Sequence, residues 1–247
     1  FRHFAMGEDS LEKVQSGIPV ILDLMKQIDR PASGTLQEQL KLSGLWEQVG
    51  EQTAEIGLIK ESYDASDKAL QVLCRLHEQH PQDAAVMQRL ISVRNNLANR
   101  LDANGQPLDA VGHLRAAAED ARRLVESEPE NLSNLYMLLV TRKNLAVLHH
   151  RKLDDSAAAK TIYEESAPYV DRLVAASLDP KYLELAASFR TNLADVCREL
   201  AQLDEAQTVI QAAVATCQRA LSSPGPANTE RMHFIFGVAL YTQAKIL

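Results

Sequence analysis

The sequence is poor in aromatic residues, glycine, proline and cysteine. Aromatic side chains make up 5% of the 247 residues, beside 10 glycines, 9 prolines and 3 cysteines. No apolar run reaches the roughly 20 residues that a membrane-spanning helix needs, so no membrane insertion is expected. The cysteines are too few and too far apart for a disulfide framework or a zinc site. We therefore expect reduced, structural thiols and a cytoplasmic location.

Positive charge is also scarce. The chain has 26 Lys and Arg against 33 Asp and Glu, a net charge of −7. A surface that follows a phosphate backbone needs the opposite balance, so nucleic acid is excluded as the expected partner. Ala, Leu, Glu, Gln and Arg dominate instead, and all of them favour helices. Because the chain starts at Phe1 and ends inside an apolar helical pattern, we expect it to be a fragment of a longer protein.

The motif Arg-x-Asn-Leu-Ala occurs three times. It begins at Arg94, Arg142 and Arg190, 48 residues apart each time. A fixed period of this size indicates an array of stacked supersecondary units. Apolar residues recur three and four positions apart around each motif, which predicts an amphipathic helix. A short polar turn and a second helix follow each copy.

Two further regularities describe the unit. A small residue in the first helix precedes an Ala in the second by twelve residues, in the pairs Gly57 and Ala69, Ala98 and Ala110, Ala146 and Ala158, and Ala194 and Ala206. Small side chains there would let paired helices approach closely. The second helices end near Pro81, Pro129, Pro180 and Pro224, since proline terminates helices. Pro168 lies inside a second helix, which it is expected to kink or split.

These spacings predict a helical map of the whole chain. The expected helices are a lead helix near 10–29, pairs near 36–59 with 62–80, 82–103 with 107–127, 131–151 with 154–177 and 181–201 with 204–221, and a last helix near 228–247.

The pattern resembles the tetratricopeptide repeat. The shared features are the Asn-Leu-Ala string, the small residue followed twelve positions later by Ala, and the proline at the repeat end. The resemblance implies an all-α, right-handed α-solenoid of antiparallel helix pairs. Residues 50–247 would hold about four pairs and a terminal helix, and residues 1–49 atypical N-terminal helices or a capping half-repeat. The family repeat has about 34 residues, so both helices are extended here. Such long repeats are similar to those appended to bacterial serine/threonine kinases and other signalling proteins.

The resemblance also implies a partner-binding face on the first helices. Its residues are Asn95, Asn96, Asn99, Asp102, Lys143, Asn144, His150, Asn192, Asp195 and Arg198. Amide side chains donate and accept, so they suit the backbone of an extended peptide. An equally weighted alternative is that the Asn residues bind backbone within the array. For the three motif arginines, a structural role is favoured.

Signatures of catalysis are missing from the sequence. It has no glycine-rich phosphate loop, no Gly-x-Ser-x-Gly, no His-Glu-x-x-His and no Cys-x-x-Cys. We therefore expect no enzyme activity, no cofactor and no metal. The predicted function is a non-catalytic protein–protein interaction scaffold that binds a peptide or protein segment on the concave face of the first helices. Two alternatives stay open: the regulatory or sensing arm of a larger bacterial signalling enzyme such as a protein kinase, and a self-association module that forms a homo-oligomer.

Overall fold

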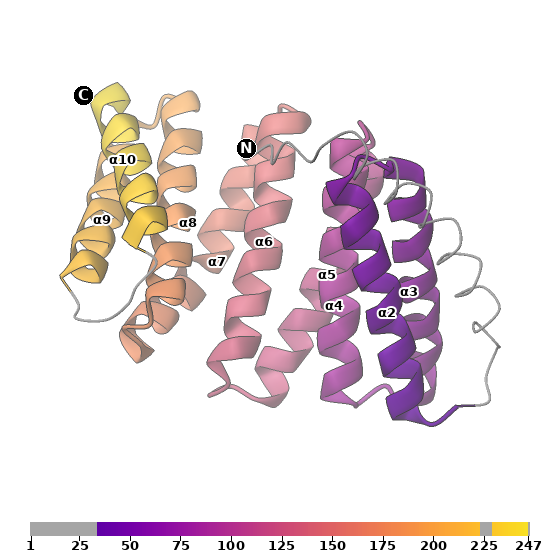
Figure 1. Cartoon of the computed structure of the whole chain (residues 1–247). Helices are drawn as coiled ribbons and strands as arrows, with labels where there is room; N and C mark the ends of the chain where they lie inside the picture. Colours follow the sequence, from indigo (N-terminus) through magenta and orange to yellow (C-terminus); the bar gives the residue numbers. More distant parts are fainter. Residues whose placement is uncertain (1–33, 223–228, 247) are drawn as a thin grey trace. The chain divides into compact units, whose positions relative to one another are not determined.

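The computed structural model describes residues 34–222 and 229–246, and the regular elements there are all α-helices (Figure 1). They are α2 Leu36–Glu55, α3 Ile59–Gln79, α4 Ala84–Ala103, α5 Pro107–Ser127, α6 Leu132–Lys152, α7 Ser156–Ala176, α8 Pro180–Glu199, α9 Leu203–Leu221 and α10 Thr229–Ile246. Each expected range matches one of these helices to within four residues at either end. The expected lead helix near 10–29 lies outside the described residues.

The helices alternate between two positions of one repeat. We name α2, α4, α6, α8 and α10 the A helices, and α3, α5, α7 and α9 the B helices. The first four A helices begin at Leu36, Ala84, Leu132 and Pro180, 48 residues apart each time. The 48-residue period of helix starts thus reaches back to residue 36. Residues 49 and 50, between which the repeat array was expected to begin, both lie within α2.

The residue before each of these A helices is a polar N-cap. The caps are Thr35, Asp83, Asn131 and Asp179. Each accepts a hydrogen bond from a backbone N–H of the first turn, which would otherwise have no partner. At Thr35 the bond is reciprocal, because the Glu38 carboxylate accepts from the Thr35 N–H at 2.7 Å.

Every turn from an A helix to its B helix contains one residue with positive φ, two positions before the B helix. These residues are Gly57 (81°), Gly105 (76°), Asp154 (53°) and Ala201 (58°). Gly57 therefore belongs to the turn, where glycine adopts this conformation without strain. The expectation that Gly57 is the small helical residue paired with Ala69 is wrong.

Buried small residues occupy fixed places in each helix pair. The fifteenth residue of the A helix is Gly50, Ala98, Ala146 or Ala194, and the fourth of the B helix is Ser62, Ala110, Ala159 or Ala206; all are buried. In the first pair the Ser62 hydroxyl donates to the Gly50 carbonyl at 2.7 Å. The third pair uses Ala159 instead of the expected Ala158, because α6 has 21 residues where α4 has 20.

The chain divides into two compact units, residues 1–113 and 114–247, and α5 contributes to both. In the first unit α2 packs on α3, and α3 packs on α4. Its core includes Trp46, Leu73 and Leu90, each at most 1% exposed. A polar contact also crosses this core, where the Arg100 guanidinium donates to the Ser66 hydroxyl at 2.5 Å.

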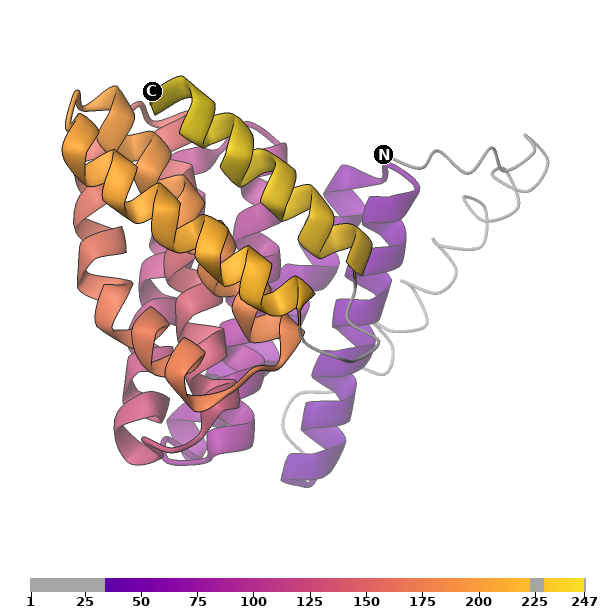
Figure 2. The same cartoon turned by 90° about the vertical axis from the view of Figure 1, so that its left-hand side faces the viewer.

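In the second unit, helices α6 to α10 pack in chain order, and α9 and α10 lie side by side (Figure 2). The A helices are also neighbours, since α8 contacts both α6 and α10. Tyr163 on α7 meets Phe189 on α8 edge-to-face in the core, with ring centroids 4.8 Å apart. Pro168 does not split α7, which continues through it.

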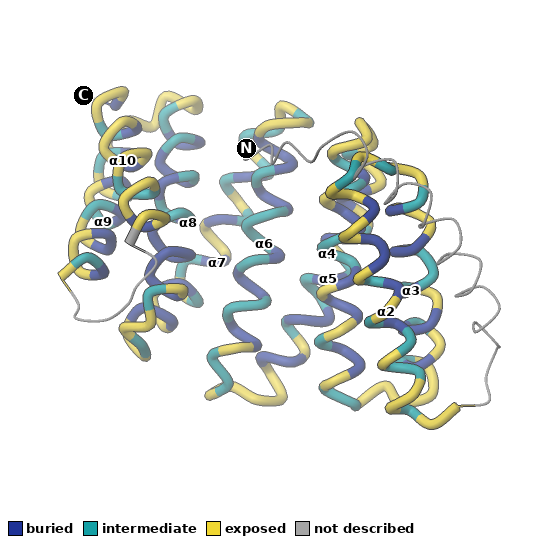
Figure 3. Tube along the Cα trace, viewed as in Figure 1, coloured by how far each residue is buried: buried dark blue, intermediate teal, exposed yellow. Residues whose placement is uncertain are grey.

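The described residues thus form an all-α solenoid of helix pairs, as the sequence predicts. None of the described helices is long and apolar enough to cross a membrane. The Asn-Leu-Ala strings lie on α4, α6 and α8, and α10 is exposed along much of its length (Figure 3). The candidate binding residues all lie on the A helices α4, α6 and α8.

Candidate partner-binding surface

In the second unit, two of the three motif asparagines line one groove. Asn144 on α6 and Asn192 on α8 occupy the same place in consecutive repeats, and the groove extends to α10. Its volume is about 450 Å³. We call it the α6–α8–α10 groove; it is lined by Lys143, Asn144, Val147, Arg151, Ser188, Thr191, Asn192, Phe234, Ile235 and Val238. Three of the predicted binding residues, Lys143, Asn144 and Asn192, are therefore brought together.

Lys143 is the half-buried cation of this groove. Burial lowers the pKa of its ammonium group, and the positive charge of Arg231 on α10 lowers it further. Arg231 itself pairs with Glu184, with 3.1 Å between Nε and Oε2. Burial raises the pKa of the Glu184 carboxyl, and Arg231 opposes that shift. The groove therefore presents a desolvated positive charge beside an ion pair that is already complete.

Apolar side chains of α10 lie uncovered at the same groove. Phe234 is 71% exposed and Val238 39% exposed, one helical turn apart. Tyr241 continues this stripe at 63% exposure, and it lies near Arg198 of α8. Large exposed apolar groups beside polar ones are typical of a surface that contacts another molecule.

Three more predicted residues gather in a separate cluster of ion pairs. His150 Nε2 lies 2.7 Å from Glu199 Oε2. Arg198 donates to Asp195 Oδ1 from Nε at 3.1 Å and from Nη2 at 2.8 Å. The donor atoms of His150, Asp195 and Glu199 lie within 4.8 Å of one another, close enough for three metal ligands. Because Asp195 accepts from Arg198 and Glu199 contacts His150, the cluster is better described as a link between α6 and α8.

The predicted residues of the first unit are all on α4. Asn95 donates to the Ile91 carbonyl of its own helix at 2.9 Å. Asn96 and Asp102 are half-buried on α4, and Asn99 is exposed. One amide donor of Asn95 is therefore used within α4, and the role of the first-unit asparagines in binding stays a prediction.

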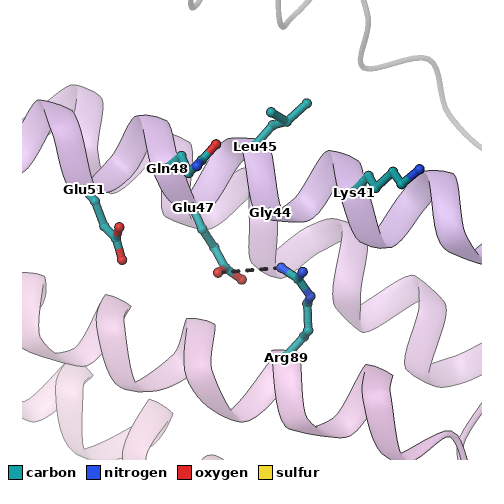
Figure 4. Close-up of a pocket in the computed structure, with 7 residues that line it drawn as sticks. All are labelled: Lys41, Gly44, Leu45, Glu47, Gln48, Glu51 and Arg89. Carbon is teal, nitrogen blue, oxygen red and sulfur yellow. Dashed lines mark ion pairs between the residues drawn. The ribbon is translucent and has the colours of Figure 1, made fainter.

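A pocket of the first unit lies between α2 and α4 (Figure 4). Its volume is about 490 Å³, and it is lined by Lys41, Gly44, Leu45, Glu47, Gln48, Glu51 and Arg89. Glu47 and Arg89 point toward each other across it, 3.9 Å apart. A Cβ at Gly44 would lie 2.8 Å from Arg89 Nη1, so glycine leaves room for that side chain. Burial raises the pKa of the Glu47 carboxyl, and Arg89 opposes that shift.

Two of the motif arginines reach from the A helix to a B helix. Arg142 donates to the Ser166 hydroxyl of α7 at 3.3 Å and lies over the ring of Tyr169. Arg190 donates to the Thr216 hydroxyl of α9 at 2.6 Å and pairs with Asp171. These contacts are the structural role that the sequence favours for the motif arginines.

Sequence analysis missed most of the lining of the α6–α8–α10 groove. Val147 and Arg151 follow Asn144 by three and seven residues, so the helical spacing that selected Asn99 and Asp195 also indicates them. Phe234, Ile235 and Val238 could not be found in this way, because α10 has no Arg-x-Asn-Leu-Ala motif to mark its inner face.

Comparison with known proteins supports the repeat assignment. The sequence model of the tetratricopeptide repeat matches residues 90–136, which is 47 residues and close to one 48-residue period. No curated protein matches the chain by sequence. Among solved structures, the chain is similar to BtubC (BKLC) from P. vanneervenii, with a TM-score of 0.55 and 17% identity over 97% of this chain and 85% of that one. At this identity the likeness shows the fold alone.

Proposed function

We propose, from the premise that this chain is built of tetratricopeptide repeats, that it is a non-catalytic scaffold binding a peptide or protein segment on its A helices. Proteins with such repeats generally bind other proteins. One observation carries the finer proposal: the α6–α8–α10 groove joins the amides of Asn144 and Asn192 to the uncovered side chains of Phe234 and Val238.

This combination suits a segment of polypeptide. The amides of Asn144 and Asn192 can donate to and accept from its backbone whatever its sequence. Apolar side chains of the segment would cover Phe234 and Val238, which removes apolar surface from water. A bound peptide can be an extended strand, which offers backbone polar groups and apolar side chains, or an amphipathic helix, which offers an apolar face.

We also propose a cytoplasmic protein. Cys74, Cys197 and Cys217 form no disulfide bond among the described residues. Burial raises the pKa of both Cys197 and Cys217 to about 11, which keeps them protonated and unreactive. Free structural thiols are usual in a reducing compartment. Measuring thiol reactivity in intact cells would test this, and disulfide-linked cysteines would contradict it.

Two further roles are compatible with the same array. It would serve as the regulatory or sensing arm of a larger bacterial signalling enzyme such as a kinase, for which the sequence of the complete gene is the test. Self-association is favoured by Leu240 and Tyr241, apolar side chains of α10 that are 43% and 63% exposed. Light scattering at several concentrations tests it, and a concentration-independent monomer mass would exclude it.

The experiment for the binding proposal is capture of partners from a lysate of the source cell. The wild type is compared with a variant carrying Asn96→Ala, Asn144→Ala and Asn192→Ala. A control variant has the exposed amides Gln79, Gln82 and Gln211 changed to Ala. We expect a partner that the first variant loses and the control keeps, with equal helicity by circular dichroism. Equal capture by all three would place binding away from the motif asparagines.

A further inference from the structure

Lys143 has an environment that is unusual for a lysine. Its side chain is half-buried, and the influences on its pKa, burial and the charge of Arg231, both act against the positive form. Among the described residues no carboxylate forms an ion pair with it. Taking an ammonium group out of water without a counter-charge costs free energy. Within the part of the chain that the structure describes, the Lys143 ammonium group therefore lies in a partly desolvated place without an acidic ion-pair partner.

The groove lining adds positive charge near Lys143 and contains no carboxylate to balance it. Arg231 is held by Glu184 at 3.1 Å, so that carboxylate is already used. Arg151, exposed one turn beyond Val147, adds a second positive charge to the lining. The residues that line the α6–α8–α10 groove include two cations and no acidic side chain. In a chain of net charge −7, such a lining is a local exception that favours an anionic group.

The apolar part of the groove restricts what that anion belongs to. Phe234 and Val238 expose large apolar surface on α10 beside the polar wall formed by Ser188 and Thr191 of α8. A free inorganic anion would leave this surface uncovered. A polypeptide segment that carries both a carboxylate and an apolar side chain satisfies both parts.

We infer that the α6–α8–α10 groove binds a partner segment in which an Asp or Glu side chain lies beside a large apolar side chain. The carboxylate accepts from the ammonium group of Lys143, and the apolar side chain packs on Phe234 and Val238. This inference rests on the proposed function and adds to it the chemistry of the partner. A carboxylate brought to Lys143 forms a charge-assisted hydrogen bond in a partly desolvated site, where such bonds are strongest.

The test selects short random peptides displayed on phage against the folded chain. Enriched sequences are then synthesised with amidated C-termini, so that a terminal carboxylate cannot replace the acidic side chain, and their affinities are measured by fluorescence anisotropy. The variants are Lys143→Gln, Phe234→Ser and the double change Asn144→Ala with Asn192→Ala. The matched control is Lys181→Gln, which removes the same charge from an exposed position of α8 outside the groove lining.

We expect enrichment of Asp or Glu next to Leu, Ile, Phe or Trp. Lys143→Gln should weaken these peptides by about tenfold or more, the size expected for one charge-assisted contact. A peptide with Gln in place of its acidic residue should bind the wild type as weakly as the acidic peptide binds Lys143→Gln. Its affinity should not change further in the Lys143→Gln variant. Lys181→Gln should leave affinity unchanged, and circular dichroism should show equal helicity for all variants.

The possible failures can be told apart. Peptides without acidic enrichment that still depend on Asn144 and Asn192 would overturn the inference and leave the proposed function standing. Acidic peptides that bind Lys143→Gln and wild type equally would also overturn it. If no peptide depends on either the asparagines or Phe234, both the inference and the proposed binding face are wrong.

Discussion

Two pockets along the described A helices have similar volumes, about 490 and 450 Å³, and different chemistry. The α2–α4 pocket balances two cations, Lys41 and Arg89, with two carboxylates, Glu47 and Glu51. The α6–α8–α10 groove has cations without carboxylates in its lining, and large apolar side chains exposed beside them. The first pocket contains carboxylates that offset its cations, with Glu47 paired to Arg89, whereas no acidic side chain lines the second.

The difference is traced to one position of the repeat. The variable second residue of the motif is Asn95, Lys143 and Thr191 in the three copies, and the residue 48 positions before Asn95 is Glu47. Glu47 lines the first pocket, while Lys143 and Thr191 line the second. The repeated Leu and Ala of the motif are buried and maintain the packing. The chemistry of the two pockets thus differs at a position whose residue type is not repeated along the array.

The largest expected difference is between a phenylalanine that builds the core and one that is exposed at the groove. Phe189 is 1% exposed against Tyr163, and Phe234 is 71% exposed. We expect Phe189→Ala to lower the free energy of unfolding by about 3–5 kcal/mol. Phe234→Ala should change it by no more than about 0.5 kcal/mol. Urea unfolding followed by circular dichroism measures both, and equal losses would contradict the assignment of Phe234 to a binding surface.

The next comparison removes one cation from each pocket. Arg89→Met leaves the Glu47 carboxylate, whose side chain is 20% exposed, without its ion-pair partner. We expect a loss of about 1 kcal/mol of unfolding free energy. Lys143→Met removes an unpaired, half-buried charge and should raise stability by about 0.5–1 kcal/mol. A loss of stability in Lys143→Met would mean that the folded chain itself stabilises this lysine.

The A-to-B turns give a smaller contrast, because the first two contain glycine and the last two do not. Gly105 has φ 76°, so Gly105→Ala introduces left-handed strain and should cost about 1 kcal/mol. Ala201 has φ 58°, and Ala201→Gly should relieve the same strain and gain about 0.5 kcal/mol. Thermal unfolding of the two variants should shift in opposite directions; shifts of the same sign would contradict the equivalence of the turns.

The smallest effect is on the pH dependence of stability. The pKa of Glu47 is raised above its usual 4.5 by burial, so its contribution to stability is complete below about pH 4.5 and is lost as pH rises through the raised value. The pKa of Glu119 is lowered to about 2 by its hydrogen bonds from Arg122. Its contribution is complete above about pH 4.5 and is lost as pH falls toward 2.

Chemical denaturation from acid to neutral pH separates these two carboxyls. We expect Glu47→Gln to reduce the decline of stability above pH 4.5, and Glu119→Gln to reduce the decline below it. Both changes should be well below the cost of truncating Phe189. Each variant is the control for the other. If both substitutions changed the curve of stability against pH in the same pH range, the opposite pKa shifts of Glu47 and Glu119 would be refuted.

Much of the fold follows from the sequence because its signals are local. Helix periodicity, proline at repeat ends and polar residues in turns predicted each described helix to within four residues. The first repeat was harder to find, since residues 46–50 keep the apolar Val49 and the small Gly50 of the motif but have neither its Arg nor its Asn. The errors at Gly57 and Ala158 share one cause. Spacing along the chain does not reveal which residue begins a turn, and one residue added to α6 shifts the facing position to Ala159.

The binding surface was less accessible to sequence reasoning. Lys143, Asn144 and Asn192 do line one groove, and their role in binding remains a prediction. His150 contacts Glu199 across α6 and α8, and Asp195 pairs with Arg198 within α8. Phe234 and Val238 had no motif to indicate them. A groove built by three helices is completed by whichever residues the third helix contributes, and those residues do not share the spacing of the other two.

By itself the sequence determined the 48-residue unit, the helix pairs and the class of the fold, because these depend on contacts between residues near in the chain and on the burial of repeated apolar stripes. The tertiary structure alone decided which polar groups satisfy each other. Glu47 and Arg89 are 42 positions apart and pair, as do His150 and Glu199, 49 positions apart. Lys143 remains without a carboxylate among the described residues. Coulomb energy and desolvation depend on distance in space and not on order along the chain, so only the packed helices distinguish a neutralised charge from one available to a partner.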